Sequence, residues 1–347
     1  MTEKEVSTEE LIAKFYSKPF YLSYSGLNKL LYSPSLFYKH YVLNQKEDKL
    51  ESYLIDGKVI HCLLLDNGSF NEQFLLTPTS LPTGNTKLVV DKVYAHYLSE
   101  LNNLAQTGVT MTALPDTLEG YPAKIIEVLL EIKLHQALKT DQQRIDKIVT
   151  EEAKSYWEFL KIRGGKDLVD AETMQRCNAA VEALRANSQA SELLGLLTNE
   201  MQNVEIINEI LMFCETDKQI GLKGVIDSIK IDHDNKIISI NDLKTTGKTI
   251  SDFKETIEFY NYWSQAAIYM RLVWYAYDAL LQDPDWKVQF NFIVIDKYQQ
   301  VYCFEVSIET MKEWQLRLED KLNEANWHYV EKNYTLPYEF ATGKVIL

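Results

Sequence analysis

The chain has 347 residues, of which 46% are hydrophobic and 25% are charged. This composition excludes a disordered chain and predicts a packed core, and the scarcity of proline and glycine excludes collagen-like or low-complexity arrays. A formal net charge of −14 argues against a general electrostatic nucleic-acid binder, because phosphate contacts need clustered lysine and arginine. It still allows a local basic groove or an acidic metal-binding pocket.

The sequence shows no segment typical of membrane insertion or secretion and no cysteine motif typical of a metal site. No apolar run reaches the roughly 18 residues that a membrane-spanning helix needs, and the acidic start, MTEKEVSTEE, is unlike a secretory signal. We therefore expect a cytoplasmic protein without membrane contact. The four cysteines form no C-x-x-C pair, which argues against a zinc site or an iron–sulfur cluster and favours reduced, buried thiols. They are Cys62, Cys177, Cys214 and Cys303.

The first part of the chain is predicted to be mainly helical, because its apolar residues recur with helical spacing. Residues 1–16 are expected to form a short polar lead into a helix. Ser23 or Ser25 is expected to cap the second helix, and Asp170 the last helix of this part. Residues 77–122 hold half of the prolines and are the least regular stretch. Helical segments are expected over 25–33, 35–43, 56–66, 89–104, 123–160 and 170–187.

The pattern changes near residue 204. Three strands rich in isoleucine and valine, with largely alternating apolar and polar residues, are predicted over 204–215, 220–232 and 236–245. A long helix is expected from about Ser251 to Leu281. A strand hairpin around Asp296–Gln299 and a last helix over 308–329 follow.

Strands followed by helices on a mixed sheet indicate an α/β or α+β fold. Because no linker-like seam is visible, we predict one domain over residues 1–347. Its mainly helical part is residues 1–200, with a less regular insertion at about 80–165. Residues 201–347 are expected to form the sheet core and the C-terminal helices.

The predicted hairpin GVIDSIKIDHDNKIISINDLKTT carries the most informative residues. If Asp234 and Asn235 lie at the centre of its turn, Asp227 falls opposite Asp242, and the two side chains share a face with Cβ atoms about 4.5–5.5 Å apart. Lys244 is two residues further on and points to that same face.

Two carboxylates that face each other repel, so this pair needs compensation. Lys244 supplies one positive charge, and Mg²⁺, which prefers carboxylate oxygens, would supply more. Such a metal can bind a phosphate and lower the pKa of an attacking water, while the lysine stabilises the developing charge. The alternative is a solvated cluster of Asp and Lys on an exposed sheet face, which the residues alone leave open.

Three further features have both a functional and an ordinary interpretation. Glu205 and Glu209, on the preceding strand, have the same face parity as Asp227, although either can be a surface residue. Gln265 and Tyr269 are four apart and share one helical face, as in any packed helix. His61 lies in an apolar helical segment, where a histidine is usually a satisfied core residue and sometimes a metal ligand.

The order of these residues resembles the PD-(D/E)-x-K nuclease superfamily, and within it the RecB-like branch with phage and prophage exonucleases of the exonuclease VIII (RecE) type. The resemblance extends over about 250 residues. The matching segments are LSYSGLNKLLYSPSLFYKHYV, GKVIHCLLLDNGSFNEQF, GLKGVIDSIKI, INDLKTT and FYNYWSQAAIYMRLV. D-x-K alone is a weak signal, but the series G-x-x-x-H, G-x-x-D, D-x-K-T-T and Q-x-x-x-Y is specific.

The resemblance implies a restriction-endonuclease-like core, in which helices flank a central mixed sheet, and a metal site within it. His61, Asp227 and Asp242 would be metal ligands, and the backbone carbonyl of Leu243 would complete the site. Glu209 is a further candidate ligand from its face parity. The expected metal is Mg²⁺, with Mn²⁺ as a substitute and no iron–sulfur cluster.

The catalytic residues implied by the resemblance are Asp227, Asp242, Lys244, Gln265 and Tyr269. The implied reaction is metal-dependent hydrolysis of linear duplex DNA, degrading one strand from its 5′ end, in phage-type recombination or end processing. Duplex DNA ends, a single-strand annealing protein and a homo-oligomeric ring are the implied partners. The implied location is the cytoplasm of a bacterium or a phage-infected host.

The sequence also departs from the family pattern. Ile226 stands before Asp227 in place of the proline of the superfamily's name, and no helicase P-loop occurs. Two alternatives stay open: a structure-specific or single-strand endonuclease on the same fold, and a catalytically inactive module that binds DNA or a protein.

Overall fold

The structure is a computed structural model that describes residues 7–45, 52–78, 80–107, 114–197 and 203–343. It divides into two compact units, the first being Met1–Phe70 with Gln175–Leu347 and the second Asn71–Met174. Of the polar lead into a helix predicted over residues 1–16, residues 1–6 lie outside the described residues. The prediction of a single domain over the whole chain stays a prediction.

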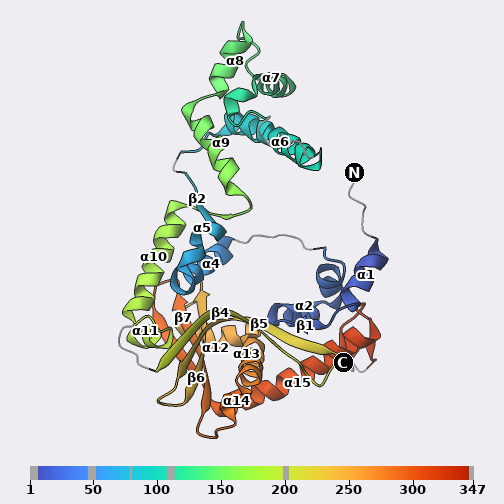
Figure 1. The fold of residues 1–347 in the computed structure, drawn as a ribbon, viewed down its shortest axis with the longest axis vertical. Coiled ribbons are helices and arrows are strands. Elements are labelled where there is room, and N and C mark those ends of the chain that lie inside the picture. Colours follow the sequence, from blue (N-terminus) through green and yellow to red (C-terminus); the bar gives the residue numbers. More distant parts are fainter. Residues whose placement is uncertain (1–6, 46–51, 79, 108–113, 198–202, 344–347) are drawn as a thin grey trace. The chain divides into compact units, whose positions relative to one another are not determined.

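The first unit contains most of the secondary structure (Figure 1). Its N-terminal elements are α1 (Thr8–Tyr16), β1 (Phe20–Leu22), α2 (Tyr24–Tyr32), α3 (Pro34–Phe37), a π-helix (Tyr38–Val42), α4 (Ser52–Leu65) and a 3₁₀ turn (Asn67–Ser69). After the second unit follow α11 (Ser188–Leu193), β4 (Val204–Cys214), β5 (Ile220–Asp232), β6 (Ile237–Thr246), α12 (Phe253–Phe259), α13 (Tyr262–Ala276), α14 (Asp278–Leu281), β7 (Lys287–Asp296), β8 (Val301–Val306), α15 (Ile308–Glu331) and α16 (Tyr338–Ala341). Two helices cross the boundaries between the units, α5 (Phe70–Gln73) and α10 (Ala171–Ala186).

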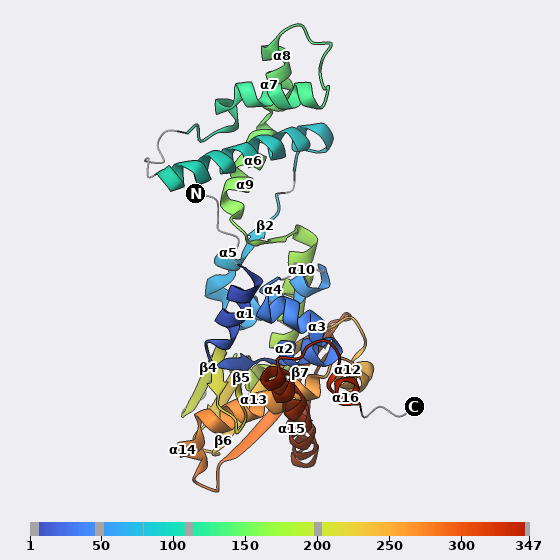
Figure 2. The same ribbon diagram turned by 90° about the vertical axis from the view of Figure 1, so that its right-hand side faces the viewer.

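A mixed sheet forms the centre of the first unit, in the order β1-β5-β6-β7-β8 with β4 also paired to β5. The pairs β1–β5 and β6–β7 are parallel, and the other pairs are antiparallel. Figures 1 and 2 show α4 and α10 on one side of this sheet and α13 and α15 on the other. The predicted mixed α/β class, with helices flanking a central mixed sheet, is confirmed.

Side chains along β6 alternate between the two faces of the sheet, and each face is covered by different helices. Ile238 and Ile240 are fully buried in the apolar core that also contains residues of α2, α13 and α15. Asn241 points to the opposite face, where its Nδ2 donates a hydrogen bond to the carbonyl of Leu193 at the end of α11 (2.8 Å).

The hairpin of β5 and β6 has the predicted register. Ile231 pairs with Ile238, and the ladder continues to Ser228 opposite Asn241, so paired residue numbers have the constant sum expected for a turn centred on Asp234–Asn235. The turn is closed by Asp232, whose carboxylate accepts a hydrogen bond from the backbone N–H of Asn235 (2.9 Å).

The helix predicted over residues 251–281 is wrong as a single element. A 3₁₀ turn (Ile250–Asp252), α12, α13 and α14 occupy this segment, with a break between α12 and α13. Asn261 has φ +56°, a left-handed conformation that ends a helix and that asparagine tolerates better than most residues. The helical spacing of apolar residues in the sequence continues across the break, so the spacing alone did not predict where α12 ends and α13 begins.

The second unit has its own apolar core, built around the aromatic rings of Trp157, Tyr121 and Tyr156. Its elements are β2 (Phe74–Leu76), α6 (Gly84–Thr107), a 3₁₀ turn (Leu118–Gly120), α7 (Pro122–Glu131), α8 (Asp141–Ile148), α9 (Glu151–Arg163) and β3 (Asp167–Val169). β2 and β3 form a short parallel pair. The insertion predicted at about 80–165 falls within this unit.

Two of the predicted helix caps can be compared with the structure. Ser23, rather than Ser25, caps α2, since its hydroxyl accepts a hydrogen bond from the N–H of Gly26 (3.2 Å). The carboxylate of Asp170 accepts from the N–H of Thr173 (2.7 Å) at the start of α10, as predicted. In the part of the chain that the structure describes, no helix has the length and apolar character needed to cross a membrane.

Candidate active site

The candidate site lies where β5 changes partner. On one edge β5 pairs with β4 along most of its length, while on the other edge it pairs with β6 only as far as Ser228 and with β1 from Leu222 backwards. Within the described residues, 223–227 pair with neither strand on that edge. Asp227 therefore stands at a fork in the sheet, where a side chain can turn into the space between two diverging strands.

The alternation of side chains between the two faces of the sheet is interrupted on both β4 and β5 at this fork. Ile207 and Ile210 are three residues apart, yet both pack against the same core, and Ile226 and Ile229 are buried together in that core in the same way. Residues three apart in a regular strand would face opposite sides. Glu209 takes up the irregularity with φ +49°, which is unusual for a residue other than glycine and is a local strain that occurs often at functional sites.

Glu205 does not lie where the strand alternation predicts. Simple alternation placed Glu205 and Glu209 on one face with Asp227. The left-handed residue breaks that parity, and Glu205 instead lies 4.0 Å from His233, measured between Oε2 and Nε2. Glu209 alone joins Asp227.

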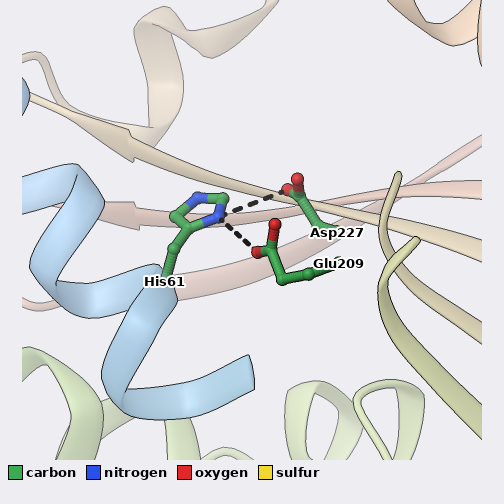
Figure 3. A group of neighbouring side chains, drawn as sticks. All are labelled: His61, Glu209 and Asp227. Carbon is green, nitrogen blue, oxygen red and sulfur yellow. Dashed lines mark ion pairs between the residues drawn. The ribbon is translucent and has the colours of Figure 1, made fainter. Parts of the chain in front are cut away.

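A histidine from α4 completes the cluster (Figure 3). Nδ1 of His61 lies 3.6 Å from Oε1 of Glu209 and 3.8 Å from Oδ2 of Asp227. These three residues offer ligand atoms that all lie within 4.8 Å of one another. They come from α4, β4 and β5, so the cluster exists only in the folded chain.

The backbone of Leu243 holds both His61 and Asp227 in place. Its N–H donates to Oδ2 of Asp227 (2.7 Å), and its carbonyl lies 2.9 Å from Nε2 of His61. A carbonyl can only accept, so Nε2 carries a proton and donates it. In the neutral ring, Nδ1 then presents its lone pair toward Glu209 and Asp227, as in metal sites where the other ring nitrogen is fixed by a hydrogen bond.

Charge at the cluster favours a cation. Burial favours the neutral form of His61, but the carboxylates of Asp227 and Glu209 outweigh it and raise the pKa of the imidazole to about 8. A protonated ring therefore offsets part of the negative charge of the two carboxylates when no metal is bound, and a divalent cation would replace that proton.

Asp242 and Lys244 form a second pair beside this cluster, and the Lys244 side chain is 13% exposed. Asp242 is completely buried, and its Oδ2 lies 2.6 Å from Nζ of Lys244. Burial raises the pKa of Asp242 to about 6, against the opposing pull of the lysine ammonium. Burial also opposes the charged form of Lys244, but Asp242 and Asp227 outweigh it, so its pKa is raised and the amine stays protonated.

One oxygen atom of the Asp242 carboxylate is buried without a hydrogen-bond partner in the part of the chain that the structure describes. Among the described residues, Oδ1 of Asp242 accepts no hydrogen bond, and a buried carboxylate oxygen without a partner is costly. Nζ of Lys244 also lies 4.9 Å from the centre of the Tyr262 ring, a cation–π contact that orients the amine.

The Q-x-x-x-Y segment forms part of α13 and lies beside these carboxylates. Nε2 of Gln265 donates to the hydroxyl of Tyr269 (3.0 Å). Burial, followed by the charges of Asp242 and Asp227, raises the pKa of Tyr269 well above its usual value. The ring packs on Gly224, where a Cβ atom would lie 2.7 Å from Cε1 of Tyr269, so only glycine fits under this ring.

The donor set fits a hard divalent cation. Carboxylate and carbonyl oxygens suit Mg²⁺ and Mn²⁺, and the imidazole adds a ligand that transition metals accept. The two features that point to such an ion are the cluster of His61, Glu209 and Asp227 and the unpartnered oxygen of Asp242.

Comparison with known families agrees with this geometry. The chain matches the PD-(D/E)XK nuclease superfamily over residues 21–332. The chain belongs to this superfamily. Members use divalent metals, which accords with the donor set described above. A comparison with curated proteins found no match.

Among solved structures, the nuclease resembles a candidate exonuclease from Eubacterium rectale. The two are 12% identical, with a TM-score of 0.43, over 100% of this chain and 88% of the other. A likeness this distant supports no further inference.

The structure brings most of the predicted site residues into one region, although their roles stay predictions. His61, Glu209, Asp227 and the Leu243 backbone form one cluster, and Asp242 pairs with Lys244 next to it. The left-handed conformation of Glu209 could not be predicted from the sequence, since no residue pattern marks a glutamate for positive φ. The place of Tyr262 over Lys244 was also missed, because it depends on the break before α13.

Proposed function

We propose that this nuclease is a metal-dependent DNA exonuclease of the RecB-like, exonuclease VIII type, acting 5′→3′ on linear duplex DNA. The observation that carries the proposal is the arrangement at the sheet fork. A donor cluster of His61, Glu209 and Asp227 lies beside the ion pair of the buried Asp242 with Lys244. Mg²⁺ is the proposed cofactor, with Mn²⁺ as a substitute.

The proposed chemistry divides between the metal and the side chains. A bound divalent metal supplies an electrophile for the scissile phosphate and lowers the pKa of a bound water. Asp227, Asp242, Glu209, His61 and the carbonyl of Leu243 would hold it.

Lys244 stays protonated and donates toward the negative charge that develops on the phosphate. Its ammonium is held by Asp242 and the ring of Tyr262, so it needs little reorganisation during the reaction. Gln265 and Tyr269 line the neighbouring helix face and position the site.

The test uses linear duplex DNA labelled at either the 5′ or the 3′ end, with closed circular DNA beside it. Each is incubated with Mg²⁺, with EDTA, and with the Lys244→Ala protein. Early loss of the 5′ label with intact circles, abolished by EDTA and by the substitution, is the expected result. Cut circles would establish the endonuclease alternative, and no cleavage of any substrate would favour an inactive binding module.

The remaining parts of the proposal rest on the resemblance of the motifs. They are a role in phage-type recombination or end processing, a single-strand annealing protein as partner, a homo-oligomeric ring and a cytoplasmic location. Sedimentation at equilibrium tests the ring, since a monomer at micromolar concentration would remove it.

A further inference from the structure

The turn between α12 and α13 is held in an unusual way. The carbonyl of Tyr260 accepts hydrogen bonds from the hydroxyl of Tyr24 (2.5 Å) and from Nδ2 of Asn28 (3.1 Å). Both donors belong to α2, more than 200 residues away in the sequence. Together with the left-handed Asn261, they stop α12 at Phe259 and fix the direction of the next few side chains.

Aromatic rings run from this turn to the lysine of the candidate site. Lys244 Nζ lies 4.9 Å from the Tyr262 ring, Tyr262 and Tyr260 have ring centres 5.6 Å apart, and Tyr260 and Phe259 have ring centres 4.8 Å apart. At the outer end, Lys248 Nζ lies 5.4 Å from the centre of the Phe259 ring. The rings thus form a continuous series that begins at the half-buried Lys244 and ends at the exposed Lys248.

The outer two rings are exposed, unlike other aromatic rings of the same segment. Phe259 is 72% exposed and Tyr260 is 47% exposed, whereas Phe253, at the start of α12, and Trp263, near the start of α13, are buried in the core. A phenylalanine this exposed contributes nothing to the core, and an exposed apolar patch beside a site often marks a binding surface.

We propose that Phe259 and Tyr260 form a stacking surface for unpaired bases of the DNA strand that enters the site. This inference rests on the proposed nuclease function and specifies the form of its substrate. Bases inside a duplex are already stacked on one another, so only a frayed or single-stranded end can present a free base face to these rings. Stacking of bases on aromatic side chains is independent of sequence, as an exonuclease requires.

Charge at the turn fits a nucleic-acid strand. Lys248, at the outer ring, can meet a phosphate of the stacked nucleotide, since phosphate contacts are supplied by lysine and arginine. The adjacent carboxylate of Glu258 is neutralised by Arg317, whose Nη1 lies 2.8 Å from its Oε2.

The test measures binding rather than cleavage. A fluorescein-labelled single-stranded oligonucleotide is titrated with the full-length protein in EDTA, beside the same oligonucleotide with abasic positions at its end. The variant is the double substitution Phe259→Leu and Tyr260→Leu, which keeps the Tyr260 carbonyl that α2 binds. The control is Tyr275→Leu, another exposed aromatic that lies about 20 Å further along α13.

The unaltered protein and the Tyr275→Leu control are expected to bind the intact strand about tenfold more tightly than the abasic strand. The double variant should bind the two strands equally. The proposal is overturned if the double variant keeps the same preference for bases, if the unaltered protein shows none, or if the unaltered protein fails to bind the intact strand.

This outcome is separable from that of the nuclease proposal, because binding in EDTA needs no catalysis. Base-dependent binding without any cleavage in Mg²⁺ would overturn the nuclease function and leave the stacking surface standing. Cleavage in Mg²⁺ with no difference between the double variant and the unaltered protein in base preference would overturn the stacking surface alone.

Discussion

The two units of this nuclease have similar apolar cores but differ in what else they bury. Apart from tyrosines, every buried polar or charged side chain among the described residues belongs to the first unit. The core of the second unit consists of aliphatic and aromatic side chains around Trp157. Its charged groups, such as Lys161 with Asp116, form ion pairs nearer the surface.

The difference accords with the site proposed at the sheet fork. A buried charge costs several kcal/mol unless it is paired and hydrogen-bonded, so a fold optimised for stability alone would avoid Asp242 and its unpartnered oxygen. The first unit keeps such groups at the sheet fork, and the second unit has no equivalent among the described residues. Four experiments test this comparison, in order of decreasing expected effect.

Replacing the central ring of the second unit should unfold that unit and not the other. Trp157 is fully buried, and Trp157→Ala is expected to cost about 3–5 kcal/mol because it removes the side chain and leaves a cavity. Hydrogen exchange read by mass spectrometry should show lost protection in α6, α7, α8 and α9. Equal loss of protection in β5 and β6 would mean that the two cores unfold together and are not separate.

Replacing a charged group at the fork should remove activity without a matching effect in the second unit. Lys244→Ala is expected to lower the initial rate of DNA cleavage about 100- to 1000-fold, since it removes the positioned cation. Lys161→Ala, which breaks a surface pair in the second unit, should leave the rate unchanged. A comparable loss in both variants would remove the distinction between the units.

Metal binding should depend on Glu209 and not on its neighbour along β4. Mn²⁺ at about 100 times its dissociation constant is expected to stabilise the unaltered protein by about 2.7 kcal/mol. Glu209→Gln should lose most of this gain, whereas Glu205→Gln, on the same strand but outside the cluster, should keep it. Thermal unfolding with and without Mn²⁺ gives the answer, and equal shifts in the two variants would place the metal elsewhere.

The smallest effect is expected at His328, a buried polar group of the first unit away from the fork. Burial lowers its pKa, against the opposing effect of its hydrogen bond to the carbonyl of Asn333 (2.5 Å). Above the ordinary histidine pKa of about 6.5 the ring is neutral in both states, and its contribution to stability is complete.

Below that pH the unfolded chain takes up the proton first, so this contribution is lost as the pH falls. The loss cannot exceed about 1.4 kcal/mol per pH unit for one proton. Urea unfolding at pH 7.5 and pH 5.5 should therefore show a smaller drop for His328→Gln than for the unaltered protein. An identical drop would mean that this buried histidine does not titrate with folding.

Much of the fold and part of the site could be read from the sequence, because local chemistry specifies them. Alternation and the turn residues Asp234 and Asn235 fix the register of the β5–β6 hairpin, and with it the position of Asp227 next to the Asp242–Lys244 pair. Side chains two residues apart on a strand share a face whatever surrounds them. The order of the motifs likewise indicated the superfamily that the chain matches.

Only the tertiary structure decided the features that depend on distant contacts. Two side chains of α2 donate hydrogen bonds to the Tyr260 carbonyl, which lies at the break between α12 and α13. The left-handed conformation of Glu209, at a place where two strands interrupt their alternation together, brings that carboxylate to His61. Periodicity in a sequence reports each element by itself, whereas these arrangements arise where one element meets another that is far away in the chain.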